Sequence, residues 1–80
     1  MLRGLRILII EDEPVIALDL RLALAEAGAD VIGVAATLDQ ALQLADAPGL
    51  MAAIVDLRLH GQSVREVVRR LSERDIPFLF

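Results

Sequence analysis

Acidic side chains follow two short apolar runs of this chain, where their type and spacing could support phosphoryl chemistry. Residues 7–10 (Ile-Leu-Ile-Ile) run into residues 11–13 (Glu-Asp-Glu), and residues 52–55 (Ala-Ala-Ile-Val) run into Asp56. Clustered carboxylates repel one another, and a hard divalent cation such as Mg²⁺ relieves the repulsion because it prefers oxygen ligands. An aspartate carboxylate is also a nucleophile toward phosphorus. If the ends of the two runs meet, the sequence predicts a magnesium site able to support phosphoryl transfer.

The composition argues against several other functions. Neither glycine-rich phosphate-binding pattern, GxGxxG or GxxxxGK[ST], occurs, which argues against a nucleotide-binding domain. The net charge of -4 argues against nucleic acid as the direct partner. There is no cysteine for disulfides or thiolate metal sites, and no apolar run approaches the roughly 18 residues of a membrane span. We therefore expect one small cytoplasmic domain of 80 residues.

Turn and capping signals divide the chain into alternating strands and helices. Pro14 suits the first turn of a helix that runs to about Ala27, with Gly28 directly after it. Residues 37–40 (TLDQ) and 63–66 (SVRE) match capping boxes and predict the starts of two further helices. Apolar strands are predicted at residues 5–10, 31–35, 52–55 and 76–80.

This alternation predicts an α/β fold with a three-layer, doubly wound parallel sheet. Two strand orders are compatible with it, a Rossmann-like order and the flavodoxin-like order 2-1-3-4. In the second order the first and third strands are neighbours, so their acids converge at the carboxyl edge of the sheet, where such folds place ligands. The strand at 52–55 is expected to be buried on both faces.

The first helix carries two apolar stripes. The stripe predicted to face the core consists of Ile16, Leu20, Ala23, Leu24 and Ala27. The opposite side carries Leu18, Leu22 and Ala25, which are either ordinary exposed residues or a surface for docking a partner.

Residues 7–14 (ILIIEDEP), and residues 54–59 (IVDLRL) about 44 residues further on, resemble the receiver domain of bacterial two-component response regulators, and the resemblance covers the whole chain. The resemblance implies that Asp56 accepts phosphate from a histidine kinase or a phosphotransfer protein, and that the domain is a signalling module rather than an enzyme. It also implies that Glu11 and Asp12 position Mg²⁺ beside Asp56, with Asp12 favoured as a direct ligand. The backbone carbonyl of Arg58 completes the implied ligand set, and Leu18 and Leu22 would lie where receivers meet their kinases.

Two departures from the family pattern stand out. Receivers usually carry proline four residues after the phosphorylated aspartate, and this chain has His60 there. Receivers also continue with a hydroxyl switch residue, an essential lysine, a fifth strand and two further helices, whereas this chain ends at Phe80 and contains no lysine. We therefore interpret residues 1–80 as a receiver domain that is incomplete after its fourth strand.

Two other functions are compatible with parts of the sequence. A degenerate receiver would dimerise or dock without being phosphorylated, and Mg²⁺ binding would distinguish it from a working one. A haloacid-dehalogenase-like phosphatase would need an Asp-x-Asp arrangement after the first strand, where this chain has Glu-Asp-Glu. Residues 76–80 are also expected to form an apolar sheet edge that could pair with a second copy of the chain.

Phosphoryl transfer to the 80-residue chain is expected to be slow. In receivers the essential lysine and the switch hydroxyl stabilise the phosphoryl oxygens, and residues 1–80 do not include either group. Incubation with Mg²⁺ and acetyl phosphate, followed by intact-mass measurement, should show little phosphorylated protein. Stoichiometric phosphate on Asp56 would contradict this expectation.

Overall fold

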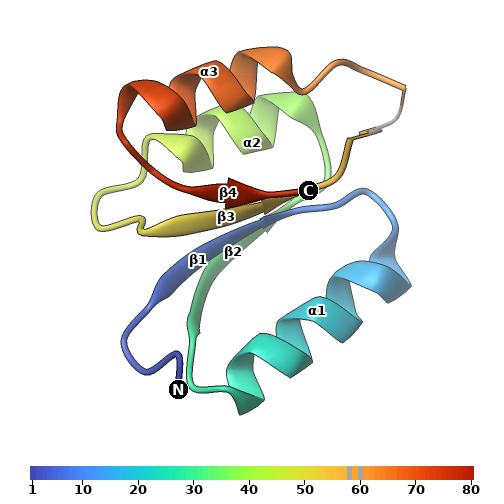
Figure 1. Cartoon of the computed structure of the whole chain (residues 1–80). Helices are drawn as coiled ribbons and strands as arrows, with labels where there is room; N and C mark the ends of the chain where they lie inside the picture. The colour runs from blue at the N-terminus through green and yellow to red at the C-terminus, as the bar shows by residue number, and fades with distance from the viewer. Residues whose placement is uncertain (58, 60) are drawn as a thin grey trace.

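The computed structural model describes residues 1–57, 59 and 61–80, and these form a four-stranded parallel sheet with helices on both faces. The elements, in chain order, are β1 (Arg6–Ile10), α1 (Pro14–Glu26), β2 (Asp30–Ala35), α2 (Leu38–Ala45), β3 (Ala52–Val55), α3 (Arg65–Glu73) and β4 (Phe78–Leu79). The strand order is β2-β1-β3-β4, which confirms the flavodoxin-like prediction over the Rossmann-like one. Figure 1 shows α1 on one face of the sheet and α2 and α3 on the other.

The main hydrophobic core lies between the sheet and the two helices α2 and α3. Alternate residues of a strand point to opposite faces, so Leu8 of β1 and Val55 of β3 both point into this core, where Val67 and Leu71 of α3 meet them. Leu8, Val67 and Leu71 are fully shielded from solvent. Val67 and Leu71 stand four residues apart, so they lie on the one face of α3 that packs against the sheet.

The other face of the sheet is only half covered. α1 packs against β1 and β2, and buries Ala17 against them. The core stripe predicted for this helix is wrong at Ile16, which is 48% exposed, and at Ala23, which is also exposed. Among the described residues, α1 is the one helix on this face of the sheet. Ile54 of β3, which lies on this half-covered face, is only partly buried. The prediction that this strand is buried on both faces is therefore wrong.

Of the two predicted capping boxes, the one at 37–40 forms in part, because its Gln40 side chain bonds to the amide of Ala36 rather than to that of the N-cap Thr37. The Thr37 hydroxyl accepts a hydrogen bond from the Gln40 amide at 3.2 Å, and the Gln40 side chain accepts one from the Ala36 amide at 2.9 Å. The predicted box at 63–66 is wrong, because α3 begins one residue later, with Val64 at the N-cap position and no side-chain cap. The Ser63 hydroxyl instead accepts a hydrogen bond from the Arg65 amide at 3.2 Å.

The last strand is shorter than predicted. The sequence predicts a strand over residues 76–80, whereas β4 contains only Phe78 and Leu79, which pair with Ala53 and Ile54 of β3. Pro77 has no amide hydrogen and cannot donate to the ladder, although its carbonyl accepts a hydrogen bond from the Ala53 amide at 3.0 Å. Among the residues that the structure describes, no helix is long and apolar enough to cross a membrane.

The different roles of Thr37 and Ser63 predict different costs for removing their hydroxyls. Thr37→Ala is expected to lower the free energy of unfolding by about 1 kcal/mol, the usual cost of losing an N-cap. Ser63→Ala is expected to cost less, because its hydroxyl does not occupy the N-cap position of α3. Urea denaturation of the two variants and of Thr37→Ser, which keeps the cap, provides the measurement. Equal losses in Thr37→Ala and Ser63→Ala would contradict this assignment.

Candidate functional site

Backbone hydrogen bonds bring the carboxyl ends of β1 and β3 together. The Asp56 amide donates to the Ile10 carbonyl at 2.8 Å, which extends the β1–β3 pairing to the first residue after β3. The Glu11 amide donates to the Ala35 carbonyl at 2.9 Å, which ties the first residue after β1 to the end of β2. Glu11 and Asp56 therefore leave neighbouring strands at the same edge of the sheet, because the strands are parallel and in register.

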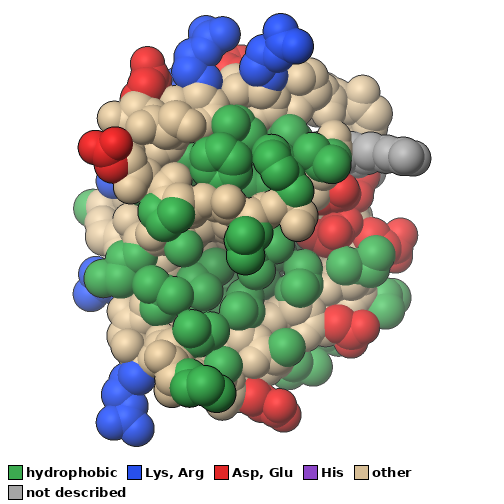
Figure 2. All heavy atoms as spheres, in the orientation of Figure 1, with side chains coloured by type: hydrophobic (Ala, Val, Ile, Leu, Met, Phe, Trp, Pro, Cys, Tyr) green, Lys and Arg blue, Asp and Glu red, His purple; other side chains and the backbone are tan. Residues whose placement is uncertain are grey.

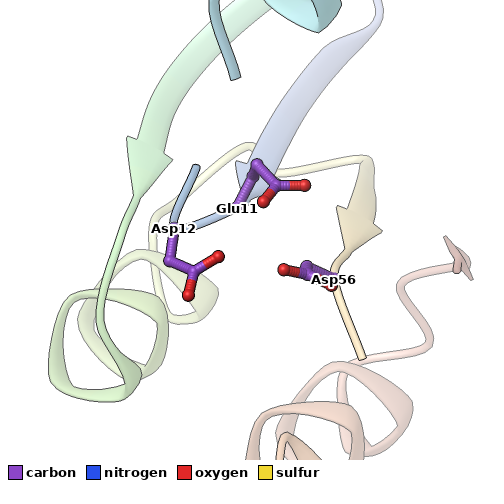
Figure 3. Close-up of side chains that lie close together, drawn as sticks. All are labelled: Glu11, Asp12 and Asp56. Atoms are coloured by element: carbon purple, nitrogen blue, oxygen red, sulfur yellow. The ribbon is translucent and has the colours of Figure 1, made fainter. Parts of the chain in front are cut away.

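Three carboxyl groups gather at this edge, as the sequence predicted. Glu11, Asp12 and Asp56 each offer an oxygen, and these oxygens all lie within 4.8 Å of one another. Figure 3 shows Glu11 and Asp12 from the end of β1 and Asp56 from the end of β3, with their carboxyl groups turned toward a common space. The Glu13 amide donates to Oε2 of Glu11 at 3.0 Å and so helps to orient that carboxylate.

The cluster has an electrostatic cost. Burial raises the pKa of the Glu11 carboxyl above its usual value, the hydrogen bond from the Glu13 amide opposes this, and the Asp56 charge and side-chain hydrogen bonds with both aspartates raise it further. A raised carboxyl pKa means that the folded protein disfavours the charged form of Glu11. A bound cation would remove that penalty, since it attracts all three carboxylates.

The donor set and its surroundings fit Mg²⁺. All three groups supply oxygen, which Mg²⁺ prefers, and Asp12 and Asp56 are partly exposed, so water can complete the coordination. A hollow of about 480 Å³ lies on one side of the cluster and is lined by Glu11 and Asp56 together with Leu20 and Phe80. A second hollow, of about 320 Å³, lies beside Glu11 and Asp12.

The remaining predicted site residues fall outside the cluster or outside the described residues. Arg58, with its implied carbonyl ligand, and His60 lie outside the residues that the structure describes. Leu18 and Leu22 are 54% and 55% exposed on α1, so both are accessible to a partner. Leu18 also lines the hollow beside Glu11 and Asp12, whereas Leu22 does not.

Sequence reasoning did not identify the other side chains that surround the acids. Arg21 of α1 lines the hollow beside Asp12, and Phe80 lines the hollow beside Asp56. Arg21 stands four residues after the buried Ala17, a spacing that places both on one side of the helix and could have indicated its proximity to the sheet. No comparable sequence signal marks Phe80.

Comparisons with known proteins found relatives and solved structures that share this fold. No model of a protein family matches the chain. The phyllosphere-induced regulator PhyR of Methylorubrum extorquens is 39% identical over 77 residues, which are 92% of this chain and 29% of that protein. The solution structure of SdrG from Pseudomonas melonis, in its BeF₃-activated conformation, superposes with a TM-score of 0.81 and 39% identity, over 100% of this chain and 69% of that one.

Two further structures are similar. The receiver (REC) domain of the response regulator PhyR from Erythrobacter litoralis has a TM-score of 0.85 and 32% identity, over 99% of this chain and 63% of that one. PhyR from Bartonella quintana, an anti-anti-sigma factor solved in complex with the anti-sigma factor NepR, has a TM-score of 0.83 and 30% identity, over 94% of this chain and 32% of that one.

The chain belongs to the receiver-domain family of response regulators. Within that family it is similar to the receiver domains of PhyR and SdrG. It spans about 30% of the length of the PhyR proteins and about two thirds of the separate receiver domains.

The raised pKa of Glu11 predicts how a charge-removing variant behaves. The folded state holds the Glu11 proton more tightly than the unfolded state does. The protonated carboxyl therefore favours folding at low pH, and this contribution to the free energy of unfolding is lost as pH rises above the pKa of the folded state. Glu11→Gln is therefore expected to raise the free energy of unfolding at neutral pH in metal-free buffer, by about 0.5 kcal/mol, the scale of partly exposed charges. The gain should disappear near pH 4, where the wild-type carboxyl is protonated.

Thermal denaturation at the two pH values measures this difference. Glu13→Gln serves as the control, since Glu13 is exposed and lies outside the cluster of three carboxyl groups. A Glu11→Gln gain that is the same at both pH values would show that Glu11 is not under electrostatic pressure from its neighbours.

Proposed function

We propose that this domain is a phosphoacceptor of a two-component signalling system, in which Asp56 receives a phosphoryl group in a Mg²⁺-dependent reaction. The convergence of Glu11, Asp12 and Asp56 within 4.8 Å carries the proposal. Membership of the receiver-domain family supports it as well. The donor is a histidine kinase or a phosphotransfer protein, and the domain is a cytoplasmic signalling module rather than an enzyme with a separate substrate.

In the proposed reaction an oxygen of Asp56 forms a bond to phosphorus while the bond between phosphorus and the donor histidine nitrogen breaks. Two features support this role for Asp56, namely that its amide is hydrogen-bonded to β1 and that the residue lines an open hollow. Glu11, Asp12 and Asp56, with the Arg58 carbonyl, would hold Mg²⁺. When bound, Mg²⁺ neutralises the charge that otherwise repels an anionic phosphoryl group.

The docking surface for the phosphodonor is proposed on α1. Leu18 and Leu22 are more than half exposed, and Leu18 borders the hollow beside Glu11 and Asp12. A partner helix that covers Leu18 would therefore lie next to the acids. Downstream, the similarity to PhyR suggests an output through contact with another protein, as PhyR of Bartonella quintana contacts NepR.

A degenerate receiver that docks or dimerises without phosphorylation is the alternative function. One observation is compatible with it, namely that Leu18 and Leu22 are more than half exposed on α1 and could dock a partner without any phosphorylation. The two functions differ in whether the acids bind a metal ion, since a docking module has no need of one.

Titration calorimetry with Mg²⁺ tests the proposal. The wild-type chain is expected to bind Mg²⁺, and Asp12→Asn and Asp56→Asn are each expected to weaken binding by at least about tenfold, since each removes a charged ligand. Glu13→Gln is the matched control and should bind like the wild type. Any phosphate gained from acetyl phosphate should be absent from Asp56→Asn. Mg²⁺ binding that is undetectable, or that both aspartate variants retain, would favour the docking module instead.

A further inference from the structure

Two arginines at the end of α3 tie this helix to α2. Nη1 of Arg70 lies 2.6 Å from Oδ2 of Asp46, in an ion pair that is also a hydrogen bond. Nη1 of Arg74, the C-cap residue of α3, donates a hydrogen bond to the carbonyl of Ala45, the last residue of α2. Arg70 and Arg74 therefore have a structural role, because both contact the C-terminal end of the neighbouring helix.

Two other arginines, Arg65 and Arg69 near the start of α3, have no such role. Both are exposed, and neither side chain makes an ion pair or a hydrogen bond with another residue in the described part of the chain. They stand four residues apart, so they lie on the same side of the helix. Figure 2 shows arginine side chains projecting at the top of the view, where α3 lies. The fold thus leaves two cationic groups unused on one side of α3.

Arg65 and Arg69 line a hollow of about 360 Å³ between α3 and the start of α2. The other lining residues are Ser63, Glu66 and Leu38, the first residue of α2. α2 packs against β2 and β1, at the opposite side of the sheet from β4. A strand added beside β4, as in complete receivers, would extend the sheet in the direction away from α2. The hollow is therefore accessible in a complete receiver domain as well as in this chain.

We propose that this hollow binds a carboxylate side chain from an acidic segment of a partner protein, between the guanidinium groups of Arg65 and Arg69. A guanidinium group presents two parallel N–H donors that match the two oxygens of a carboxylate. The half-buried Leu38 offers an apolar contact to the methylene groups of a glutamate. No side chain caps the start of α3, so its partial positive charge adds to that of the arginines.

The surrounding charges favour a short acidic protein segment over a nucleic acid. Glu66 lines the hollow, Asp39 lines an adjoining hollow that shares Leu38, and the chain as a whole has a net charge of -4. A nucleic acid carries a charge at every phosphate, so it would press further charges against these acids. A protein segment can place one or two carboxylates at the arginines and uncharged side chains beside the acids.

An NMR titration of the isotope-labelled chain with hexaglutamate tests the proposal. The amide signals of residues 63–69 and the side-chain Nε–H signals of Arg65 and Arg69 are expected to shift on addition of the peptide. Hexaglutamine, which has the same length without the charge, should leave these signals in place. The titration is run without Mg²⁺ or a phosphodonor, and Glu11, Asp12 and Asp56 do not line this hollow. A negative result would therefore leave the proposed function untouched.

Substitutions in the hollow give the expected size of the effect. Arg65→Gln and Arg69→Gln are each expected to weaken hexaglutamate binding about threefold, the scale of one exposed ion pair, and the double variant about tenfold. Glu66→Gln should strengthen binding about twofold, because it removes a negative charge from the hollow. Arg3→Gln is the matched control, since Arg3 is an exposed arginine outside the hollow, and it should bind like the wild type.

Several outcomes would contradict the proposal. Equal shifts with hexaglutamate and hexaglutamine would mean that the hollow does not recognise charge. An Arg3→Gln loss as large as that of Arg65→Gln would mean that overall charge, rather than this hollow, attracts the peptide. Tighter binding of inorganic phosphate or of a short single-stranded DNA than of hexaglutamate would assign the arginines to phosphate groups instead of an acidic protein.

Discussion

The hydrogen bond from the Asp56 amide to the Ile10 carbonyl sets the arrangement on which the site depends. It fixes the register of β3 against β1, and register decides which residues reach the carboxyl edge at the same height. With this register, Asp56 leaves β3 beside Glu11 and Asp12. A slip of one residue would turn Val55 out of the main core and carry Asp56 away from the other acids. Packing in the core and placement of the acids are thus enforced by the same ladder.

Much of this arrangement could be predicted from the sequence, because it follows from local signals and topology. The apolar runs at 7–10 and 52–55 mark buried strands, and strand order then brings their acidic ends together. The coverage of the sheet could not be predicted in this way. Helical spacing grouped Ile16 with Leu20 in one core stripe, yet Ile16 is exposed, because spacing does not reveal how many strands lie beneath a helix and α1 packs mainly against β1 and β2.

The other errors of the sequence analysis also have physical causes, some of them local and one of them not. The SVRE sequence has the residue types of a capping box. In the structure, however, Val64, with φ -92° and ψ 10°, takes the N-cap position that the pattern assigns to Ser63. β4 is short because Pro77 interrupts the donors of the ladder. The walls of the two hollows, which include Phe80 and Arg21, depend on the packing of distant segments, and no short pattern in the sequence specifies that.

The hollow that contains Asp56 is closed on another side by Phe80, one residue beyond β4. The ring of Phe80 therefore borders the space into which the proposed phosphoryl group on Asp56 would project. A change in the packing of the segment around β4 would move this ring and alter the shape of that space.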